Sequence, residues 1–329
     1  MGSQELESRQ SADKIKYFFV INPNAGRRRE QKRLHANIVK ACEAAGADFE
    51  IYDTECAGDG GEYMISAVNA LLEGENADPE LSLRFYFGGG DGTVLESANA
   101  YMALPEELRR SGRVAVGILP VGTGNDFLRN FGTAKDFLNI DRQLAAEARD
   151  VDLIAYGGKY CANMFNIGFD CQVVVRVNHN HGKAFMTKNL AYPLGVVHTL
   201  RKFPHTFLRV SFDNGEEFKG KFLLTLVSNG SYCGGGFNAA SKARPDDGLL
   251  DVLMVDPITR RQFISMVGKY KKGQLLGTEL GDSISTLRKC RSVTIESPEE
   301  TDICVDGEVE RFTKVTMTNV PAAFRFLVP

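Results

Sequence analysis

Residues 85–97, FYFGGGDGTVLES, place four glycines around one carboxylate, Asp91, directly after an aromatic run. Two similar loops follow other apolar runs, namely residues 22–26 (NPNAG) and residues 122–126 (GTGND). Glycine lets backbone N–H groups approach phosphate oxygens, and a helix N-terminus behind such a loop favours negative charge. The three loops together therefore indicate a nucleotide-phosphate site, whereas any one of them alone would more often be a plain turn.

These loops need a scaffold that brings them to one edge. Apolar, β-rich runs at residues 14–21, 49–53, 83–87 and 114–119 predict strands. Helical spacing between them predicts helices over residues 28–45, around residues 64–72 and from about residue 93. Alternating strands and helices predict a parallel sheet with helices on both faces. In such a sheet the carboxyl ends of the strands face one crevice, which is the usual ligand site.

The two commonest phosphate-binding motifs are absent from the sequence. No G-x-x-x-x-G-K-[ST] stretch occurs, so the site is not a P-loop. The run GGGDG lacks the G-x-G-x-x-G spacing of the dinucleotide fingerprint. The site must therefore belong to another class of nucleotide-binding protein.

The pattern changes after about residue 150. Short strands recur around Gly157-Gly158, Asn214-Gly215 and Asp306-Gly307, which are typical turn dipeptides of hairpins. Two helical stretches interrupt them, near residues 186–202 and 258–270. We expect an antiparallel β-sandwich or barrel here. The predicted division is a disordered leader at 1–13, a nucleotide-binding α/β domain at 14–149, a β-rich substrate domain at 150–318, and a segment at 319–329 that returns to the first domain.

Composition excludes several classes. Apolar residues make up 43% and charged residues 25% of the 329 residues, which is ordinary for a globular protein. The net charge of −3 argues against bulk nucleic-acid binding. No apolar run approaches the roughly 20 residues of a membrane span, and the polar first residues do not resemble a signal peptide. Seven scattered cysteines without a C-x-x-C pair favour free thiols in a reducing cytoplasm.

One segment departs from this average. Residues 171–212 contain no Asp or Glu, but they contain four of the five histidines and several lysines and arginines, with apolar side chains such as Phe203 and Phe207. A basic, apolar segment suits an anionic membrane surface. A core helix with a solvated cationic face would give the same pattern, and the sequence does not separate the two.

At this point the chain resembles a known family. The motifs NPNAG, GGGDGT and PVGTGNDF, in this order and spacing, are similar to the catalytic-domain signature of diacylglycerol kinases, a superfamily that includes sphingosine and ceramide kinases and soluble bacterial lipid kinases. The second half adds DVDLI, NIGFD, SNGSYCGGG, DDGLLDV and VDGE in matching order. The resemblance covers the chain after residue 13.

The resemblance implies a fold and a site. The fold would be an α/β domain like that of phosphofructokinases and NAD kinases, with a β-sandwich-like second domain and the active site in the cleft between them. Asp91 would organise Mg²⁺ and the phosphates, and Asp126 and Asp152 would line the cleft. Glu308 matches the proposed general base, with Asp306 beside it, although Asp306-Gly307 alone could be only a turn. The residues that would contact ATP are Asn22, Pro23, Asn24, Ala25, Gly26, Thr54, Gly89, Gly90, Asp91, Gly92, Thr93, Val94, Leu95 and Thr123.

The resemblance also implies a second metal. A structural Mg²⁺ would be bound by Asp247 and by the backbone carbonyls of Arg244 and Leu249, although the DDG stretch could be only a turn. Phosphoryl transfer needs positioning, charge neutralisation by Mg²⁺ and a carboxylate near the acceptor hydroxyl. One departure is visible in the glycine motif, because Leu95 stands where the family usually has asparagine.

The main hypothesis is an ATP- and Mg²⁺-dependent lipid kinase, most simply one that converts diacylglycerol to phosphatidic acid. Its partners would be a membrane lipid, reached by peripheral contact with an anionic membrane at the inner face of the cell membrane, and a second copy in a homodimer. The alternatives are a kinase of a sphingoid base or phosphatidylglycerol, an NAD-kinase-like enzyme with a soluble substrate, and a non-enzymatic nucleotide- or lipid-binding protein.

Overall fold

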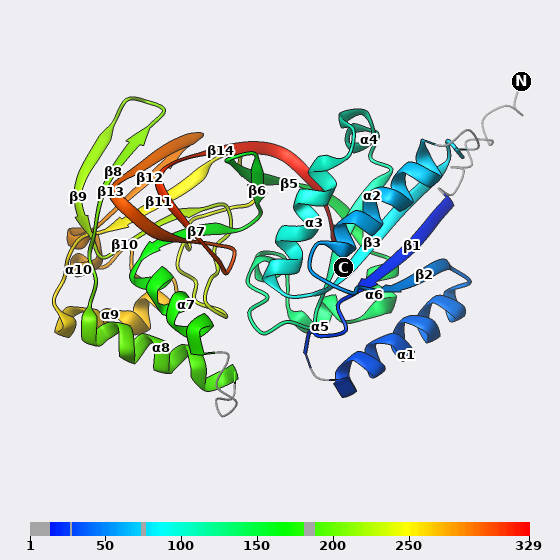
Figure 1. The fold of residues 1–329 in the computed structure, drawn as a ribbon, viewed down its shortest axis with the longest axis horizontal. Coiled ribbons are helices and arrows are strands. Elements are labelled where there is room, and N and C mark those ends of the chain that lie inside the picture. Colours follow the sequence, from blue (N-terminus) through cyan, green and yellow to red (C-terminus); the bar gives the residue numbers. More distant parts are fainter. Residues whose placement is uncertain (1–13, 27, 74–76, 181–187) are drawn as a thin grey trace, which may run out of the picture.

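The computed structural model describes residues 14–26, 28–73, 77–180 and 188–329, and the predicted leader at 1–13 lies outside the described residues. Figure 1 shows an elongated molecule with a β-rich half and a half in which helices flank a parallel sheet. The fourteen described strands form one continuous sheet, whose main path is β12-β11-β10-β7-β13-β14-β4-β3-β1-β2. The predicted combination of an α/β half with a β-rich half is confirmed.

The first half alternates strands and helices. Strand β1 pairs in parallel with β2 and β3, and β3 pairs in parallel with β4. Such pairing requires crossover connections, which the helices provide. The elements are β1 (Lys14–Ile21), α1 (Arg28–Ala45), β2 (Asp48–Asp53), α2 (Asp59–Leu72), β3 (Leu81–Gly89), α3 (Asp91–Ala103), α4 (Glu106–Ser111), β4 (Val114–Pro120), the 3₁₀ turn η1 (Phe127–Asn130), α5 (Ala134–Phe137) and α6 (Ile140–Leu144).

The second half is mainly antiparallel. Strand β10 pairs antiparallel with β7 and β11, and β13 pairs antiparallel with β7, β8 and β14. The elements are β5 (Glu147–Tyr156), β6 (Lys159–Cys161), β7 (Met164–Gly168), α7 (Phe169–Asn180), α8 (Lys188–Lys202), β8 (Thr206–Phe212), β9 (Glu217–Phe222), β10 (Leu224–Ser228), β11 (Leu250–Val255), α9 (Arg260–Lys271), α10 (Glu279–Ile284), β12 (Ser285–Cys290), β13 (Ser292–Val305) and β14 (Glu308–Val328).

Two of the predicted hairpin turns have the backbone that their sequences demand. Gly157 and Gly158 both have positive φ between β5 and β6, and Asp306 (φ 45°) and Gly307 (φ 94°) join β13 to β14. Positive φ at both central residues is the two-residue turn whose twist matches the flanking strands. The second turn brings Asp306 and Glu308 to the end of a hairpin.

Strand β14 joins the two halves. Its first part pairs with β13, and its last part pairs with β5 and, at Phe326, with Val116 of β4. Figure 1 shows this strand, in red, crossing from the β-rich half into the other half. A break in the register between Val320 and Phe324 contains Ala322, which has a positive φ of 50°. The sheet therefore bends where it passes from one half to the other.

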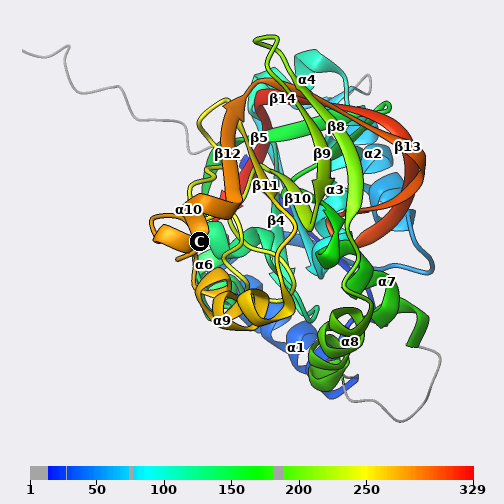
Figure 2. The ribbon, with the colours of Figure 1, turned by 90° about the vertical axis from the view of Figure 1, so that its left-hand side faces the viewer.

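Helix α7 was not predicted from the sequence. Its residues include several β-branched side chains, which favour strands. Strand β7 ends at Gly168 with φ 88°, where an added Cβ would lie 2.5 Å from the Leu223 carbonyl oxygen, so the turn requires glycine. The chain therefore turns directly from β7 into α7. Helix α7 contacts α8, and α8 lies beside α9 in both views (Figures 1 and 2), where the Arg260 guanidinium donates to the carbonyls of Leu200 and Arg201.

Candidate active site

The three glycine loops meet at one edge of the parallel sheet. The Asn22 N–H donates to the Gly88 carbonyl over 3.1 Å, and the Gly122 N–H donates to the Gly89 carbonyl over 3.0 Å. An added Cβ on Gly122 would lie only 2.4 Å from the Gly90 Cα. Glycine is therefore required sterically at this junction, and the predicted convergence of the loops is confirmed.

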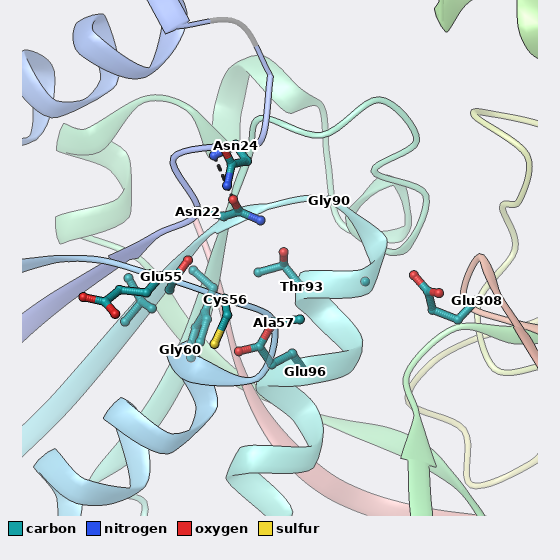
Figure 3. Close-up of a pocket in the computed structure, with 14 residues that line it drawn as sticks. Asn22, Asn24, Glu55, Cys56, Ala57, Gly60, Gly90, Thr93, Glu96 and Glu308 are labelled. Carbon is teal, nitrogen blue, oxygen red and sulfur yellow. Dashed lines mark hydrogen bonds between the residues drawn. The ribbon is translucent and has the colours of Figure 1, made fainter. Parts of the chain in front are cut away.

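A cavity of about 350 Å³ opens beside these loops (Figure 3). Of the predicted nucleotide contacts, it is lined by Asn22, Asn24, Thr54, Gly90, Gly92 and Thr93. Glu308 also lines it, and Figure 3 shows this side chain beside the start of α3, on the side away from Asn22 and Glu55 and coming from the other half. The cavity therefore lies between the phosphate-type loops and a carboxylate of the β13–β14 hairpin.

The remaining predicted nucleotide contacts lie elsewhere. Val94 is buried in the core of the first half. Leu95 packs against the core of the second half, which gives a physical reason for an apolar residue at this position. Gly89 packs on Thr93, and the Ala25 carbonyl accepts a hydrogen bond from Gln31. Pro23, Ala25, Gly26, Gly89, Val94 and Leu95 do not line the cavity, and Asp91 and Thr123 line a neighbouring one.

The neighbouring cavity, of about 220 Å³, contains a group of carboxylates. Asp91, Asp126 and Asp306 line it, together with residues of both halves that include Thr123, Asn163, Asn166 and Cys233. Two valines of α7, Val174 and Val177, form its apolar side. Acidic groups and an apolar wall thus face each other across the junction of the two halves.

Asp91 and Asp126 share one network. The Asp126 N–H donates to Asp91 Oδ1 over 2.6 Å, and Asp126 Oδ2 accepts from the Gly235 N–H over 2.8 Å. Burial raises the pKa of Asp91 to about 7, and the neighbouring Asp126 carboxylate adds to the rise. Burial also raises the pKa of Asp126, although Arg129 and two backbone N–H groups oppose it. Close carboxylates of raised pKa are a setting that a cation stabilises, so this pair fits Mg²⁺ bound with nucleotide phosphates.

Asp306 and Glu308 have different surroundings. Asp306 is buried, and its carboxylate accepts from the N–H groups of Ala162, Asn163 and Met164 at 2.9 to 3.2 Å. Burial is the main cause of its raised pKa. Glu308 is exposed, and among the described residues no hydrogen bond or ion pair involves its carboxylate. Of the two residues that the sequence left open as the base, Glu308 has the accessible carboxylate.

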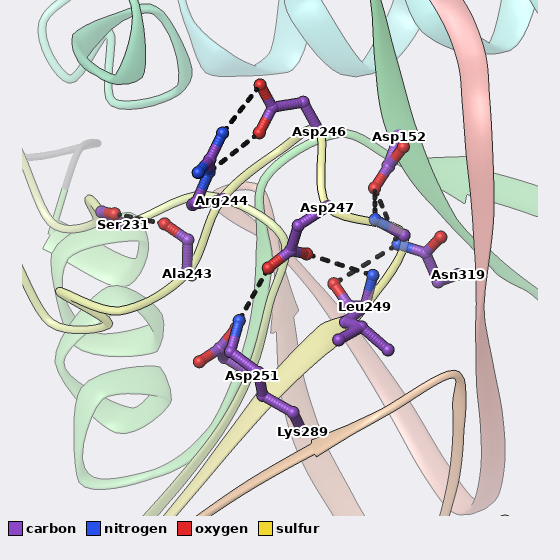
Figure 4. A network of polar contacts seen from close by, with 11 residues as sticks. Asp152, Ser231, Ala243, Arg244, Asp246, Asp247, Leu249, Asp251, Lys289 and Asn319 are labelled. Atoms are coloured by element: carbon purple, nitrogen blue, oxygen red, sulfur yellow. Dashed lines mark hydrogen bonds and ion pairs between the residues drawn. The ribbon is translucent and has the colours of Figure 1, made fainter.

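Asp152 lies in a different place from the one predicted. It is buried and lines neither cavity. Its Oδ2 accepts from the Gly248 N–H over 2.7 Å, and its Oδ1 accepts from the Ala322 N–H over 2.9 Å. Figure 4 shows it beside the turn that contains Asp247. In this structure Asp152 therefore fixes the bend of β14 to that turn.

The predicted structural-metal residues do not form an open set of oxygen ligands. Asp247 Oδ2 lies 2.7 Å from Lys289 Nζ, and its Oδ1 accepts from the Leu249 N–H over 3.1 Å. The Leu249 carbonyl accepts from the Asn319 amide over 3.4 Å. Within the described residues, no group of three or more His, Cys, Asp or Glu side chains is arranged to bind a metal. The Lys289 ammonium thus takes the cation position beside Asp247, and with it in place the Asp247 carboxylate and the Leu249 carbonyl do not fit a divalent ion.

Several lining residues were not predicted from the sequence. Glu55, Cys56, Ala57, Gly60 and Glu96 line the first cavity. Glu96 also accepts a hydrogen bond from the Gly61 N–H over 2.9 Å, which connects α3 to the start of α2. In the sequence, only the position of Glu96 inside the glycine motif pointed to it. The carboxylate of that motif to which the sequence assigned a role was Asp91.

The basic segment is partly described. Gln172, Val175, Arg176, His198, Thr199, Lys202 and Pro204 line a cavity of about 320 Å³ between α7 and α8. Burial lowers the pKa of His198, and the positive charges of Arg176, Lys202 and Arg201 lower it further. Phe207 is 39% exposed, as expected, but Phe203 is buried against Phe169 and Phe263. None of the helices in the described part of the chain is both long and apolar enough to cross a membrane.

Comparisons with known proteins place the chain among lipid kinases. Residues 16–156 match the diacylglycerol kinase catalytic domain, and residues 163–328 match the YegS C-terminal NAD kinase beta sandwich-like domain. A diacylglycerol kinase of Bacillus subtilis is 27% identical over 88% of both chains. A probable YegS-like lipid kinase of Pseudomonas aeruginosa is 31% identical over 74% of this chain and 75% of that protein.

A solved structure shares the fold. A putative diacylglycerol kinase from Bacillus anthracis superposes with a TM-score of 0.72 at 23% identity, and the match covers 99% of both chains. The arrangement of an α/β half and a β-rich half is therefore a known one.

Proposed function

The chain belongs to the family of diacylglycerol kinases and YegS-like lipid kinases, and from this premise we propose that it transfers the γ-phosphate of ATP to the hydroxyl of diacylglycerol, giving phosphatidic acid. The observation that supports this most is the placement of Glu308. Its carboxylate comes from the second half, yet it lines the same cavity as the glycine loops of the first half.

The loops would hold the nucleotide. Backbone N–H groups of the loop around Asn24 and of Gly92 would face the phosphates. Gly92 lies in the first turn of α3, where the helix dipole favours negative charge. Mg²⁺ would be bound by the phosphates beside Asp91 and Asp126, and it would neutralise charge that develops on the transferred group. Ion binding at these carboxylates would also offset the burial, and the repulsion from Asp126, that raise the pKa of Asp91.

Glu308 would serve the acceptor. The lipid hydroxyl oxygen forms a bond to the γ-phosphorus while the bond from that phosphorus to the bridging oxygen of ADP breaks. The hydroxyl proton passes to the Glu308 carboxylate, which is accessible in the cavity. Asp306 positions the hairpin by accepting three backbone N–H groups, and it does not need to contact the lipid.

We also propose that the basic segment faces the membrane. Arg176 and Lys202 lie around one cavity between α7 and α8, and residues 171–212 contain no acidic side chain that could neutralise them. A lipid substrate must be taken from a bilayer, and anionic lipids attract such a surface. Binding to anionic vesicles should weaken with added salt and with neutralisation of Arg201 and Lys202. Binding that is insensitive to salt would contradict this part of the proposal.

One assay tests the reaction. Labelled ATP and Mg²⁺ are offered with vesicles that contain diacylglycerol, phosphatidylglycerol, a sphingoid base or undecaprenol, and separately with NAD. We expect label in phosphatidic acid, and none with the Asp91→Ala variant, which controls for contaminating kinases. If another lipid is labelled in preference, that lipid and not diacylglycerol is the acceptor. Preferred labelling of NAD would mean a kinase of a soluble substrate. ATP binding without turnover on any acceptor would indicate a binding protein.

A further inference from the structure

Two acidic side chains and one lysine come together at the start of β11 (Figure 4). Asp251 lies directly opposite Lys289 in the antiparallel register of β11 and β12. Asp247 belongs to the turn that precedes β11. Lys289 Nζ lies 2.7 Å from Asp247 Oδ2 and 2.9 Å from Asp251 Oδ2. A single ammonium group therefore contacts both carboxylates, and strand pairing fixes its position.

The burial of Asp251 makes this contact necessary. Asp251 is only 1% exposed, and an ionised carboxylate without a counter-charge is costly at such a position. Across the described residues, Lys289 is the one cation within ion-pair distance of Asp251. The side chain of Lys289 remains 37% exposed, so its stem reaches inward from the surface while its head faces the two carboxylates.

The same contacts occupy the place where a divalent ion would bind. Asp247 accepts from Lys289 and from the Leu249 N–H, and the Leu249 carbonyl accepts from the Asn319 amide. A metal here would have to displace the ammonium and would then be repelled by it. Two of the three expected ligands, the Asp247 carboxylate and the Leu249 carbonyl, are thus already partners of groups within the chain.

We propose that the Lys289 ammonium replaces a structural divalent cation at the Asp247–Asp251 turn, so that the second half of the protein folds without bound metal. The consequence reaches beyond the turn. Gly248 of this turn donates to Asp152, and the Asp152 N–H donates to the Pro245 carbonyl over 2.7 Å. Asp152 in turn holds Ala322 at the bend of β14. Lys289 therefore stabilises the junction between the two halves.

The first measurement is the metal content of the native protein. After gel filtration in metal-free buffer without chelator, metal analysis should find no stoichiometric divalent ion in the nucleotide-free wild type. Its melting temperature should be the same in EDTA and in plain buffer. Because Mg²⁺ could also bind at Asp91, any rise in melting temperature with added Mg²⁺ or Ca²⁺ should be equal in the wild type and in Asp247→Asn.

The second measurement removes the ammonium. Lys289→Met should lower the melting temperature in EDTA, and Lys289→Arg should largely preserve it. Lys289→Met should also acquire a response to Mg²⁺ or Ca²⁺, because the two carboxylates are now free, and this response should disappear in Lys289→Met with Asp247→Asn. The matched control is Lys314→Met, since Lys314 pairs with Glu296 across β13 and β14 at the surface, and we expect little change.

The outcomes separate the alternatives. A stoichiometric metal in the desalted wild type, or a metal-induced shift that Asp247→Asn abolishes in the wild type, would overturn the proposal. An unchanged melting temperature in Lys289→Met would do the same. If Lys289→Met does not fold, the double variant Lys289→Met with Asp251→Asn, which lacks the buried charge, should fold, and its failure would count against the proposal. These readouts do not involve phosphoryl transfer, so they are independent of the proposed lipid kinase activity.

Discussion

At the scale of single residues, the β13–β14 turn separates two carboxylates that the sequence places side by side. Asp306 has positive φ and points its carboxylate back at three backbone N–H groups. Glu308, two residues later, lines the nucleotide-side cavity. The Asp306 carboxylate is buried and its oxygens are occupied by backbone N–H groups, whereas the accessible Glu308 carboxylate can accept a proton from a substrate hydroxyl.

This difference predicts two distinct mutant phenotypes. Glu308→Gln should reduce kcat by about 10²-fold or more because proton transfer is lost, while its melting temperature stays that of the wild type. Asp306→Ala should destabilise the protein by roughly 3 to 5 kcal/mol because buried donors lose their acceptor. Turnover and thermal unfolding measure the two effects. Glu310→Gln is the matched control, since Glu310 lies on the same strand and pairs with Lys159. Full activity in Glu308→Gln would refute the assignment.

Gly122 provides a second residue-scale prediction. Its missing Cβ leaves room for the Gly90 backbone, which would otherwise lie 2.4 Å away. Gly122→Ala should therefore separate the two loops and raise the Kd for ATP by about tenfold or more, equivalent to at least ~1.4 kcal/mol. Calorimetric titration measures this. Gly268→Ala is the control, because its Cβ meets no atom within 4 Å and α9 should gain about 0.5 to 1 kcal/mol. Equal ATP affinity in both variants would contradict the steric argument.

At the scale of elements, α7 of the second half lies between the acidic cavity and the basic segment. One face of α7 presents Val174 and Val177 to the acidic cavity, and another presents Gln172 and Arg176 to the basic one. Its first turn is anchored by Asp170, which accepts a 2.6 Å hydrogen bond from the Tyr270 hydroxyl of α9. The orientation of α7 thus depends on a buried polar contact.

This contact predicts a pH dependence of stability. Burial raises the pKa of Asp170 from 3.8 to about 6, although the Tyr270 hydrogen bond opposes the rise. Between these values the folded state binds more protons than the unfolded state, so the contribution of Asp170 to stability falls as pH rises from about 4 to about 6 and is constant above. The loss amounts to at most about 3 kcal/mol. Denaturant unfolding measures the free energy of unfolding of the wild type and of Asp170→Asn across this pH range. The difference between the two free energies should change by this amount, and a constant difference would contradict the prediction.

The elements also show what the sequence could predict. Apolar runs and glycine breaks located β1, α1, β3 and β4 closely, because the three strands are nearly continuous buried runs and α1 has its buried residues at helical spacing. Helix α7 was not found, since its β-branched residues favour a strand, whereas its packing against α8 and the burial of Val173 are tertiary contacts that the local sequence does not show. Family resemblance placed Asp152 and Asp247 near ligands, but their partners are Ala322 and Lys289, which are distant in sequence.

At the scale of the whole molecule, one strand makes the two halves a single sheet. Strand β14 begins at the turn that carries Asp306, pairs with β13, bends at Ala322 and ends between β4 and β5. The position of Glu308 relative to the glycine loops therefore depends on how the far end of the same strand is packed. A rigid junction of this kind keeps a site between two halves assembled before substrate binds.

The far end of β14 supplies the last prediction. Phe326 is fully buried, and its ring contacts Phe127 and Phe131 at centroid distances of 5.1 and 5.2 Å. Phe326→Ala should cost about 3 to 5 kcal/mol through the cavity it leaves. Because the strand is shared, thermal unfolding should remain one transition, and hydrogen exchange should accelerate in β3 and in β11 alike. Phe207→Ala, at an exposed position, serves as the control and should change stability by less than about 1 kcal/mol. Faster exchange confined to β3 would show that the halves unfold independently and that β14 does not couple them.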